Sequence, residues 1–174
     1  MQAIVAADLN FAIGCGGQMI YHLPEDLKFF ARMTRGKVLV MGRGTLESLP
    51  GGKPLKDRVN IVLSRDARCA PPGVVMARSL SQLEAIIAPY PADEVMVIGG
   101  QQIYALLIDC CSQAHVTRVR ATAPADRFFP NLDQRPGWEL AEESPVYESG
   151  GIPYTHCLYV NRQSKPLSAI TQPR

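Results

Sequence analysis

Residues 37–49, KVLVMGRGTLESL, place an almost wholly apolar run before a glycine-flanked turn and a short helical segment. Residues 94–108, EVMVIGGQQIYALLI, repeat the same order of strand, glycine turn and helix. Nearly continuous apolar strands that alternate with helices are typical of parallel sheets buried on both faces. These two stretches therefore predict an α/β fold built around a parallel sheet.

Further strand patterns lie on either side of these stretches. Strands are expected over residues 2–7, 58–66 and 74–77, and residues 79–88 form a helical pattern that Ser79 or Ser81 can cap. From residue 114 onward the pattern is β without helices, and residues 138–160 hold two alternating runs around a Gly-Gly pair, which predicts an antiparallel hairpin. The expected fold is a mostly parallel central sheet of about eight strands with flanking helices and this C-terminal hairpin. We expect one domain over residues 1–162 and a mobile, proline-containing tail over residues 163–174.

Length and composition exclude several classes of protein. The chain has 174 residues, of which 47% are hydrophobic and 20% charged, the balance of an ordinary globular domain. Its formal net charge of +2 provides no electrostatic reason to expect a nucleic acid or an anionic membrane as a partner. No apolar run approaches the roughly 18 residues that span a bilayer. Asp8 also interrupts the first apolar run, so we expect neither a membrane protein nor a signal peptide.

The cysteines and histidines predict neither disulfides nor a metal site. Five cysteines form no C-x-x-C pair, and the three histidines lie far apart without metal-ligand spacing. We therefore expect free thiols, a reducing cytoplasmic location and no bound metal.

Residues 12–22, AIGCGGQMIYH, carry glycine at positions 14, 16 and 17. Such a run is unsuited to a helix and pairs poorly as a strand. We expect a loop here, because a loop of about ten residues between packed elements often serves as a lid or a binding segment.

The helical pattern that follows, residues 21–33, YHLPEDLKFFARM, contains one acid in an unusual place. At about 100° per residue, Asp26 falls between Phe30 and Met33, on or beside the face that should be buried. Asp26 either stabilises the positive end of the helix dipole or is a shielded carboxylate that binds a cation or paired N–H donors. Glu25 already serves the dipole from the polar side, and position alone leaves both interpretations open. The apolar stripe of the same helix consists of Leu23, Leu27 and Phe30.

The two glycine turns, Met41–Thr45 and Ile98–Gln102, follow strands at their carboxyl ends, where open α/β sheets bind ligands. Helix N-termini present free N–H groups there, and glycine lets a phosphate approach closely. Neither turn matches G-x-G-x-x-G or a Walker A sequence, so each can equally be only a tight turn. The pair of turns, together with Arg43 and the segment Ser64–Asp66, suggests a ligand with more than one phosphate group.

Taken in order, the segments AIG…M, LPEDLKFF, VMGRGTLESL, NIVLSR, VIGGQQIY, VTRV and DRFFP resemble the dihydrofolate reductase family in its bacterial form. The resemblance runs through most of residues 2 to about 160. It implies an oxidoreductase that uses NADPH to reduce 7,8-dihydrofolate to 5,6,7,8-tetrahydrofolate. In the implied reaction a hydride passes from nicotinamide C4 to pterin C6, and pterin N5 is protonated. The resemblance further leads us to expect a monomer, with antifolate inhibitors as additional ligands.

The resemblance also assigns roles in the substrate site. The residues that the resemblance marks as catalytic are Asp26, Tyr21 and Thr117. Asp26 matches the ionisable side chain that bonds the N3 and 2-amino edge of the pterin, and Thr117 matches the hydroxyl that supports it. Tyr21 matches a side chain that bonds a water near the acid, and its hydroxyl can also donate. Arg58 matches the arginine that pairs with the glutamate tail of the substrate, although by its pattern alone it would be a solvated charge at a strand end. The residues expected to line the substrate site are Ile4, Ala6, Asp26, Leu27, Phe30, Ser48, Leu49, Leu55, Arg58, Ile98, Tyr104 and Thr117.

The cofactor is expected along the glycine-rich loop and the two glycine turns. Ser64 and Arg65 stand where the family reads the adenosine 2′-phosphate, and the Gly99–Gly100 peptide bond is cis in the family. The residues expected to bind NADPH are Ala6, Ile13, Gly14, Gln18, Met19, Gly42, Arg43, Gly44, Thr45, Leu63, Ser64, Arg65, Ile98, Gly99, Gly100, Gln101, Gln102, Ile103 and Tyr104.

Several residues depart from the family pattern. Tyr21 stands where bacterial members usually have tryptophan, and Ile20 stands where proline is common. Gly44 and Gln102 replace side chains that are often basic, which leaves more of the phosphate recognition to Arg65.

Two other functions are compatible with parts of the pattern. A pyrimidine reductase of riboflavin synthesis with the same fold should lack both the acid at position 26 and the tail-binding arginine, and this chain has both. A non-catalytic nucleotide-binding module would keep the glycine turns but would need no buried acid.

Overall fold

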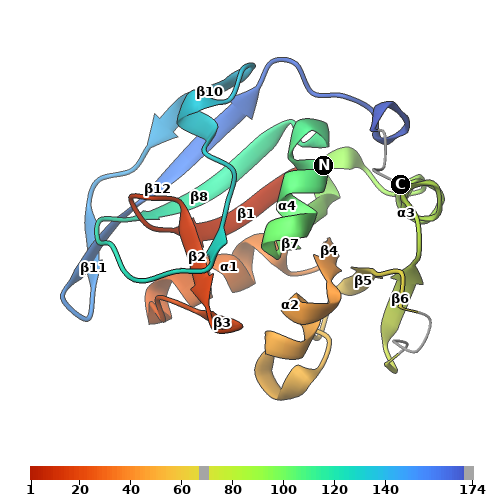
Figure 1. Cartoon of the computed structure of the whole chain (residues 1–174), viewed down its shortest axis with the longest axis horizontal. Coiled ribbons are helices and arrows are strands. Elements are labelled where there is room, and N and C mark those ends of the chain that lie inside the picture. The colour runs from red at the N-terminus through yellow and green to blue at the C-terminus, as the bar shows by residue number, and fades with distance from the viewer. Residues whose placement is uncertain (67–70, 171–174) are drawn as a thin grey trace.

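A twisted nine-stranded sheet runs through the centre of the molecule in the computed structural model, which describes residues 1–66 and 71–170 (Figure 1). One half of the sheet is parallel and contains, in spatial order, β6 Val74–Ala77, β5 Val59–Leu63, β4 Val38–Gly42, β7 Val95–Gly99 and β1 Gln2–Ala7. Next to β1 lies β8 Gln113–Val119, also parallel. The antiparallel part of the sheet follows. In it, β12 Ile152–Asn161 pairs with β8 on one side and with both β10 Trp138–Glu143 and β11 Tyr147–Ser149 on the other. The mostly parallel sheet of the prediction is confirmed.

Short helices connect the parallel strands. The α-helices are α1 Pro24–Thr34, α2 Arg43–Ser48, α3 Leu80–Ile87 and α4 Gln101–Leu107. Ser79 caps α3, since its hydroxyl accepts the N–H of Gln82 at 3.1 Å. Single 3₁₀ turns occur at Pro50–Gly52, Ala92–Glu94, Ile108–Cys110, Leu132–Gln134 and Leu167–Ala169.

Alternation along the buried strands separates two hydrophobic cores, one on each face of the sheet. In β4, Val38 and Val40 pack with residues of α3 and α4, whereas Leu39 and Met41 pack on the opposite face with α1 and α2. Successive strand side chains point to opposite faces, so a strand covered on both faces must be apolar throughout. This explains the unbroken apolar runs of the sequence.

The glycine-rich segment differs from its prediction as an unpaired loop. It forms the short strands β2 Ala12–Cys15 and β3 Gln18–Met19, which pair with each other and, through β2, with β9 Arg127–Phe128. The tight turn between β2 and β3 uses Gly16 and Gly17 at φ 58° and 80°. Glycine therefore makes the turn of a hairpin here instead of preventing strand pairing.

The C-terminal hairpin also has more parts than predicted. Gly150 and Gly151 form its turn at positive φ, as expected, but the first alternating run is divided into β10 and β11. Pro145 lies in the interruption between them, and proline supplies no N–H to a strand ladder. Both pieces pair with β12.

Structure continues beyond the predicted domain boundary at residue 162. The Lys165 N–H donates to the Asp109 carbonyl at 2.8 Å, and Leu167 is buried in the core beside α3. The predicted tail thus packs on the domain at least as far as the 3₁₀ turn Leu167–Ala169. Its last residues, 171–174, lie outside the described residues.

No helix in residues 1–66 and 71–170 combines the length and apolar character that a membrane span requires. Across the same residues, no three side chains of histidine, cysteine, aspartate or glutamate form a group that could hold a metal ion. The cysteines in this part of the chain, Cys15, Cys110, Cys111 and Cys157, are free thiols, and Cys69 lies outside it.

Candidate active site

The buried acid of α1 lies beside the sheet. Asp26 is only 8% exposed, and its Oδ1 accepts the hydroxyl of Thr117, on β8, at 2.5 Å. No described protein group donates to its Oδ2. Burial raises the pKa of the Asp26 carboxyl, while the Thr117 hydrogen bond and the nearby ring of His156 oppose the rise. The carboxylate is therefore shielded and still has one oxygen available for a ligand donor.

Glu25 shows that Asp26 is more than a helix-dipole acid. Glu25 is exposed and accepts the Ser149 hydroxyl at 2.7 Å, which is the leading cause of its lowered pKa. This neighbouring acid already faces the positive end of α1 from the solvent side. Of the two interpretations of Asp26, the geometry favours the shielded carboxylate.

His156 joins the acid and was not identified from the sequence. Its Nδ1 lies 3.1 Å from Thr117 Oγ1 and 3.9 Å from Asp26 Oδ1. The ring stacks on Phe29 of α1 with centroids 4.0 Å apart. His156 and Thr117 are directly paired across β12 and β8, so only the strand register places them together. The sequence signal was a polar residue in the alternating pattern of β12, which means little until the partner strand is known.

Apolar side chains of α1, α2 and the sheet form a hydrophobic core on the face of the sheet that carries Thr117. Leu27 of α1 is 46% exposed, although the sequence places it in the apolar stripe, while Leu23 is buried. An exposed leucine beside a shielded acid is suited to contact a ligand. The predicted substrate residues that belong to this core are Ile4, Phe30, Leu49, Leu55 and Ile98.

Arg58 lies at the other end of α1. Its guanidinium donates to the Thr34 hydroxyl at 3.1 and 3.3 Å, to the Ala31 carbonyl at 2.9 Å and to the Lys56 carbonyl at 2.6 Å. These bonds fix a planar cation near the carboxyl end of the helix. Arg58 is therefore a positioned charge, unlike the solvated strand-end charge that its pattern alone suggests.

The two glycine turns are brought together at the carboxyl ends of β4 and β7. A Cβ on Gly42 would come within 3.0 Å of Ile103, and a Cβ on Gly100 within 3.3 Å of Thr45 Oγ1. The Gly99–Gly100 bond is cis, as the resemblance implies. Neither α2 nor α4 has a side-chain cap at its N-terminus, so N–H groups of both turns are left for a ligand.

The cations predicted for the phosphates lie at the edge of these turns. Arg43 pairs with Asp66 at 3.3 Å and with Glu47 at 3.6 Å, and its side chain is half exposed. Asp66 donates its N–H to the Ser64 hydroxyl, and Arg65 between them is exposed. The structure thus brings Arg43 and the Ser64–Asp66 segment together, because β4 and β5 are parallel neighbours.

Other predicted cofactor residues are already held by the protein. The Tyr104 hydroxyl donates to the Ile4 carbonyl at 2.7 Å in the core, and Gln101 accepts the Phe128 N–H at 2.7 Å. Gln18, Met19 and Gln102 are exposed.

In the glycine-rich hairpin, the Gly16 N–H donates to Asp126 Oδ2 at 3.1 Å. This bond ties the hairpin to the segment that follows β8.

Tyr21 makes no hydrogen bond to Asp26. Its hydroxyl is buried without a hydrogen-bond partner among the described residues, and its ring packs near Leu23 and Tyr154. Burial is the main cause of its raised pKa, with a smaller contribution from Asp8. Within residues 1–66 and 71–170, the Tyr21 hydroxyl therefore donates neither to Asp26 nor to another protein group.

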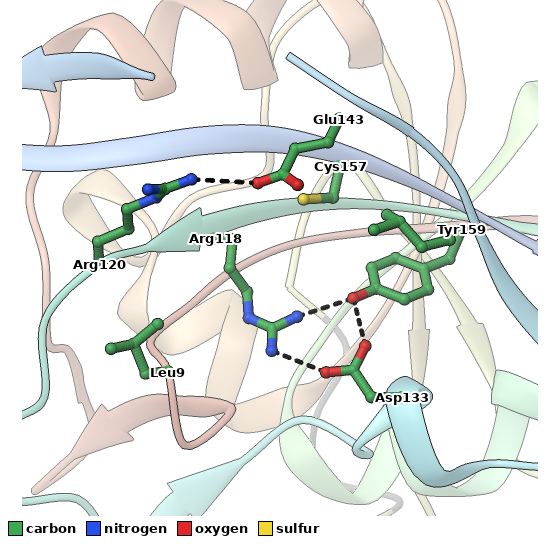
Figure 2. A pocket seen from close by; sticks show the side chains of 8 residues that line it. Leu9, Arg118, Arg120, Asp133, Glu143, Cys157 and Tyr159 are labelled. Atoms are coloured by element: carbon green, nitrogen blue, oxygen red, sulfur yellow. Dashed lines mark hydrogen bonds and ion pairs between the residues drawn. The ribbon is translucent and has the colours of Figure 1, made fainter. Parts of the chain in front are cut away.

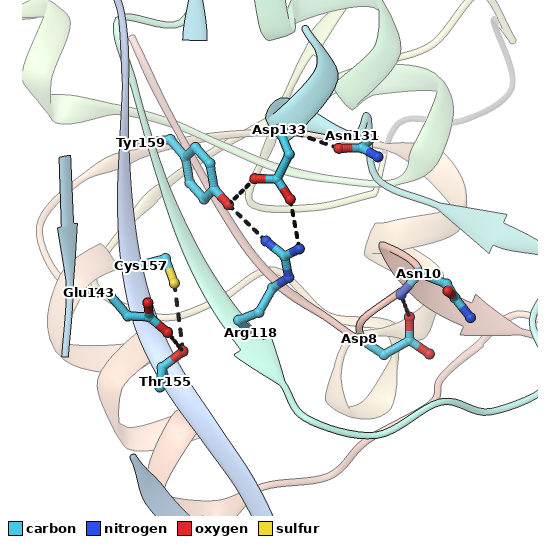
Figure 3. A network of polar contacts seen from close by, with 9 residues as sticks. All are labelled: Asp8, Asn10, Arg118, Asn131, Asp133, Glu143, Thr155, Cys157 and Tyr159. Carbon is cyan, nitrogen blue, oxygen red and sulfur yellow. Dashed lines mark hydrogen bonds and ion pairs between the residues drawn. The ribbon is translucent and has the colours of Figure 1, made fainter. Parts of the chain in front are cut away.

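A cavity of about 420 Å³ lies on the opposite face of β8 and β12 from Thr117 and His156. Figure 2 shows the Arg118 guanidinium between Tyr159 and Asp133, at 2.7 and 2.8 Å. Figure 3 shows the same network with Glu143 accepting the Thr155 hydroxyl, and Asp8 accepting the Asn10 N–H. Because it lies on the opposite face of the sheet, this cavity is separate from the candidate site. In its lining, Arg118 pairs with Asp133 and Arg120 pairs with Glu143. The side chains that line it are Leu9, Arg118, Arg120, Asp133, Leu140, Glu143, Cys157 and Tyr159.

Comparison with known proteins places this site in a family. A family model described as dihydrofolate reductase matches residues 1–161. A dihydrofolate reductase of Neisseria gonorrhoeae is 39% identical over 160 residues, which cover 91% of this chain and 96% of the relative. Dihydrofolate reductase type A13 of Escherichia coli is 35% identical over 159 residues, with 91% and 93% covered. A solved structure of dihydrofolate reductase from Enterococcus faecalis, complexed with NADP(H) and RAB-propyl, superposes with a TM-score of 0.81 at 33% identity and covers 92% of this chain and 95% of its own. This chain belongs to the dihydrofolate reductase family.

Proposed function

We propose that this protein is an NADPH-dependent dihydrofolate reductase that converts 7,8-dihydrofolate to 5,6,7,8-tetrahydrofolate. One observation carries the proposal within the family: the buried Asp26 carboxylate, held by Thr117, keeps one oxygen without a donor from residues 1–66 and 71–170. The N3 and 2-amino edge of a pterin offers two N–H donors in one plane, which suits a carboxylate. A nucleotide-binding module would have no use for such an acid.

The residues present fit NADPH. The adjacent glycine turns leave uncapped N–H groups, and added Cβ atoms at Gly42, Gly99 and Gly100 would meet neighbouring groups within 3.3 Å. Arg43 and Thr45 would hold the phosphates at the first turn, and the residues from Gly99 onward would hold those at the second. Ser64 and Arg65 would bind the 2′-phosphate. The positive charge of Arg65 would then favour NADPH over NADH, which lacks this phosphate. When bound, NADPH supplies the hydride for pterin C6.

The remaining catalytic work falls to the protein. Asp26 would orient the pterin by its N3 and 2-amino edge, and its negative charge would favour a proton at N5. Because Asp26 would hold the opposite edge of the ring, the proton would reach N5 through water. The apolar side chains of Ile4, Leu27 and Phe30 would exclude bulk solvent once the substrate is bound, and Arg58 would pair with the glutamate tail of the substrate.

Loss of absorbance at 340 nm with NADPH and dihydrofolate tests this function directly. We expect turnover that requires both compounds. Isothermal titration adds a second readout, because a nucleotide-binding module would bind NADPH and leave dihydrofolate unbound. Reduction of an aminopyrimidine of riboflavin synthesis in place of dihydrofolate would overturn the proposal.

We further propose a monomer that acts in the cytoplasm and binds antifolates in competition with dihydrofolate. The free thiols of the described cysteines are compatible with a reducing compartment. A planar inhibitor with an amidine-like edge would use the same carboxylate as the substrate.

A further inference from the structure

A chain of two hydrogen bonds leads from His156 to the acid of the site. Thr117 has a single hydroxyl proton, and its 2.5 Å contact with Asp26 Oδ1 uses that proton when the acid is ionised. The 3.1 Å contact between His156 Nδ1 and Thr117 Oγ1 must then take its proton from the ring. While Asp26 is ionised, we therefore expect Nδ1 of His156 to carry a proton, in the neutral as well as in the charged ring.

The surroundings hold this ring in place. The imidazole stacks on Phe29 and meets the ring of Tyr154 edge-on, with centroids 4.0 and 5.4 Å apart. The backbone N–H of His156 donates to the Ser144 hydroxyl at 2.9 Å. A side chain fixed from two sides loses little entropy when it donates a hydrogen bond, so the donor is preorganised.

The charged groups around His156 act in opposite directions. Burial lowers the pKa of the ring, Arg32 of α1 adds to this effect, and Asp26 of the same helix opposes it. The ionisable neighbours from the strands are Tyr147 of β11 and Tyr154 of β12, whose rings lie 5.8 and 5.4 Å away. Glu25 is turned to Ser149 instead. With a lowered pKa, His156 is mostly neutral at pH 7, where its effect on Asp26 must come through the hydrogen bonds.

We propose that His156 is a positioning residue for Asp26: through the Thr117 hydroxyl, it orients the carboxylate and favours its ionised form. The inference rests on the role proposed above for Asp26. A hydrogen bond donated toward the charged form of an acid lowers its pKa, and donors in series polarise one another. His156 thus tunes the group that would bind the pterin without touching the pterin itself.

Two substitutions separate the donor from the ring. His156→Phe keeps a flat ring against Phe29 but removes the donor, and His156→Asn keeps an N–H near the position of Nδ1 without a titrating group. We expect the midpoint of the Asp26 titration, followed by carboxyl ¹³C NMR on the free protein, to move upward in His156→Phe and to stay near the parent value in His156→Asn. His115→Phe is the matched control, because His115 is also partly buried but pairs with Gln2 at 3.0 Å.

A Thr117→Val background tests the route. If the effect passes through the hydroxyl, adding His156→Phe there changes the Asp26 midpoint no further. The proposal would be overturned if His156→Phe alone left the Asp26 midpoint unchanged. It would also be overturned if His156→Phe shifted that midpoint equally in the parent protein and in the Thr117→Val background. Thermal unfolding of each variant confirms that the fold is intact.

The unaltered protein supplies a measurement that needs no variant. Above the Asp26 midpoint, a long-range ¹H–¹⁵N spectrum should show His156 protonated at Nδ1, and a proton on Nε2 with a bare Nδ1 would contradict the proposal. In the working enzyme, the pH dependence of kcat/KM for dihydrofolate should move to higher pH in His156→Phe, with a roughly two- to tenfold change near the midpoint. The NMR readouts use free protein, so their failure is distinct from a failure to reduce dihydrofolate.

Discussion

Asp26 and Glu25 are adjacent acids in the first turn of α1, yet their surroundings give them opposite properties. Glu25 is exposed, and its bond from Ser149 lowers its pKa. Asp26 is buried, and the loss of solvation raises its pKa despite the bond from Thr117. At the scale of single residues, the site depends on which face of the helix an acid occupies.

Substitution of the acid should separate activity from stability. Asp26→Asn keeps the shape but removes the charge, so we expect turnover at neutral pH to fall roughly 10²–10⁴-fold in the NADPH and dihydrofolate assay. Unchanged turnover would sink the assignment.

Because the folded chain holds the Asp26 proton more tightly than the usual pKa of 3.8 implies, ionisation of Asp26 costs stability as pH rises above that value. The variant should therefore unfold at the same or a higher temperature at pH 7, and this advantage should disappear below about pH 3.8.

Arg65 should set the choice of cofactor. Its exposed guanidinium follows Ser64 at the end of β5, and a charge-assisted bond to a 2′-phosphate supports a preference for NADPH over NADH. We expect Arg65→Ala to reduce the ratio of kcat/KM for NADPH to kcat/KM for NADH by about ten- to a hundredfold. Arg65→Lys should keep most of the preference for NADPH. Equal kcat/KM for the two cofactors in the parent enzyme would count against this role.

At the scale of elements, the two strand-turn-helix units meet through their glycines. Gly99 has φ 115°, and an added Cβ would lie 2.9 Å from Tyr104 Cε2. The Tyr104 ring cannot yield easily, because its hydroxyl joins α4 to β1 through the Ile4 carbonyl. Gly44 lies inside α2 with nothing within 4 Å of its Cβ position. Glycine is therefore required by backbone conformation and packing at position 99, whereas the space around position 44 would admit a side chain.

These glycines should respond oppositely to alanine. Gly99→Ala should lower the free energy of unfolding by about 2–4 kcal/mol, because backbone strain and overpacking act together. Gly44→Ala should raise it by up to about 1 kcal/mol, because alanine favours a helix over glycine. Urea denaturation at pH 7 measures both, and a Gly99→Ala variant as stable as Gly44→Ala would contradict the geometry.

Across the whole molecule, a polar network holds the long connection after β8 against the sheet. Arg118 of β8, Tyr159 of β12 and Asp133 of the connection bond one another at 2.6 to 2.8 Å (Figure 3). The same connection carries Asp126, which bonds the glycine-rich hairpin. Parts of the chain that border the site are thus anchored from the opposite face of the sheet.

This anchor should lose strength in acid. Burial opposes ionisation of Asp133, but bonds from Arg118 and Tyr159 outweigh it and lower the pKa below 3.8. Its contribution is present above that value and is lost as pH falls through the lowered pKa. Asp133→Asn should therefore reduce the free energy of unfolding by about 1 kcal/mol at pH 7, allowing for solvent screening, and by less as the pH falls through the lowered pKa of Asp133. Glu142→Gln, at an exposed position of β10, is the control and should leave the free energy of unfolding unchanged over the same range of pH.

Much of the molecule could be predicted from local pattern. Unbroken apolar runs identified the parallel strands because each is buried on both faces. The pattern misjudged residues 12–22, since pairing of β2 with the distant β9 depends on contacts beyond the window of a local motif. Likewise, the docking of Leu167 on the core depends on α3, far away in the chain.

The fold class, the family resemblance and the acid at position 26 can be read from the amino-acid order alone, because hydrophobic periodicity and ordered motifs are local properties of the chain. The family resemblance predicts that Thr117 supports Asp26, and the folded chain shows their hydrogen bond. The burial of Asp26 and the contact of His156 with Thr117 became visible in the fold alone. Those facts depend on the register of β8 against β12 and on the packing of α1 across both strands. Desolvation and hydrogen bonding are set by such distant neighbours, so the chemistry of the carboxylate belongs to the folded molecule.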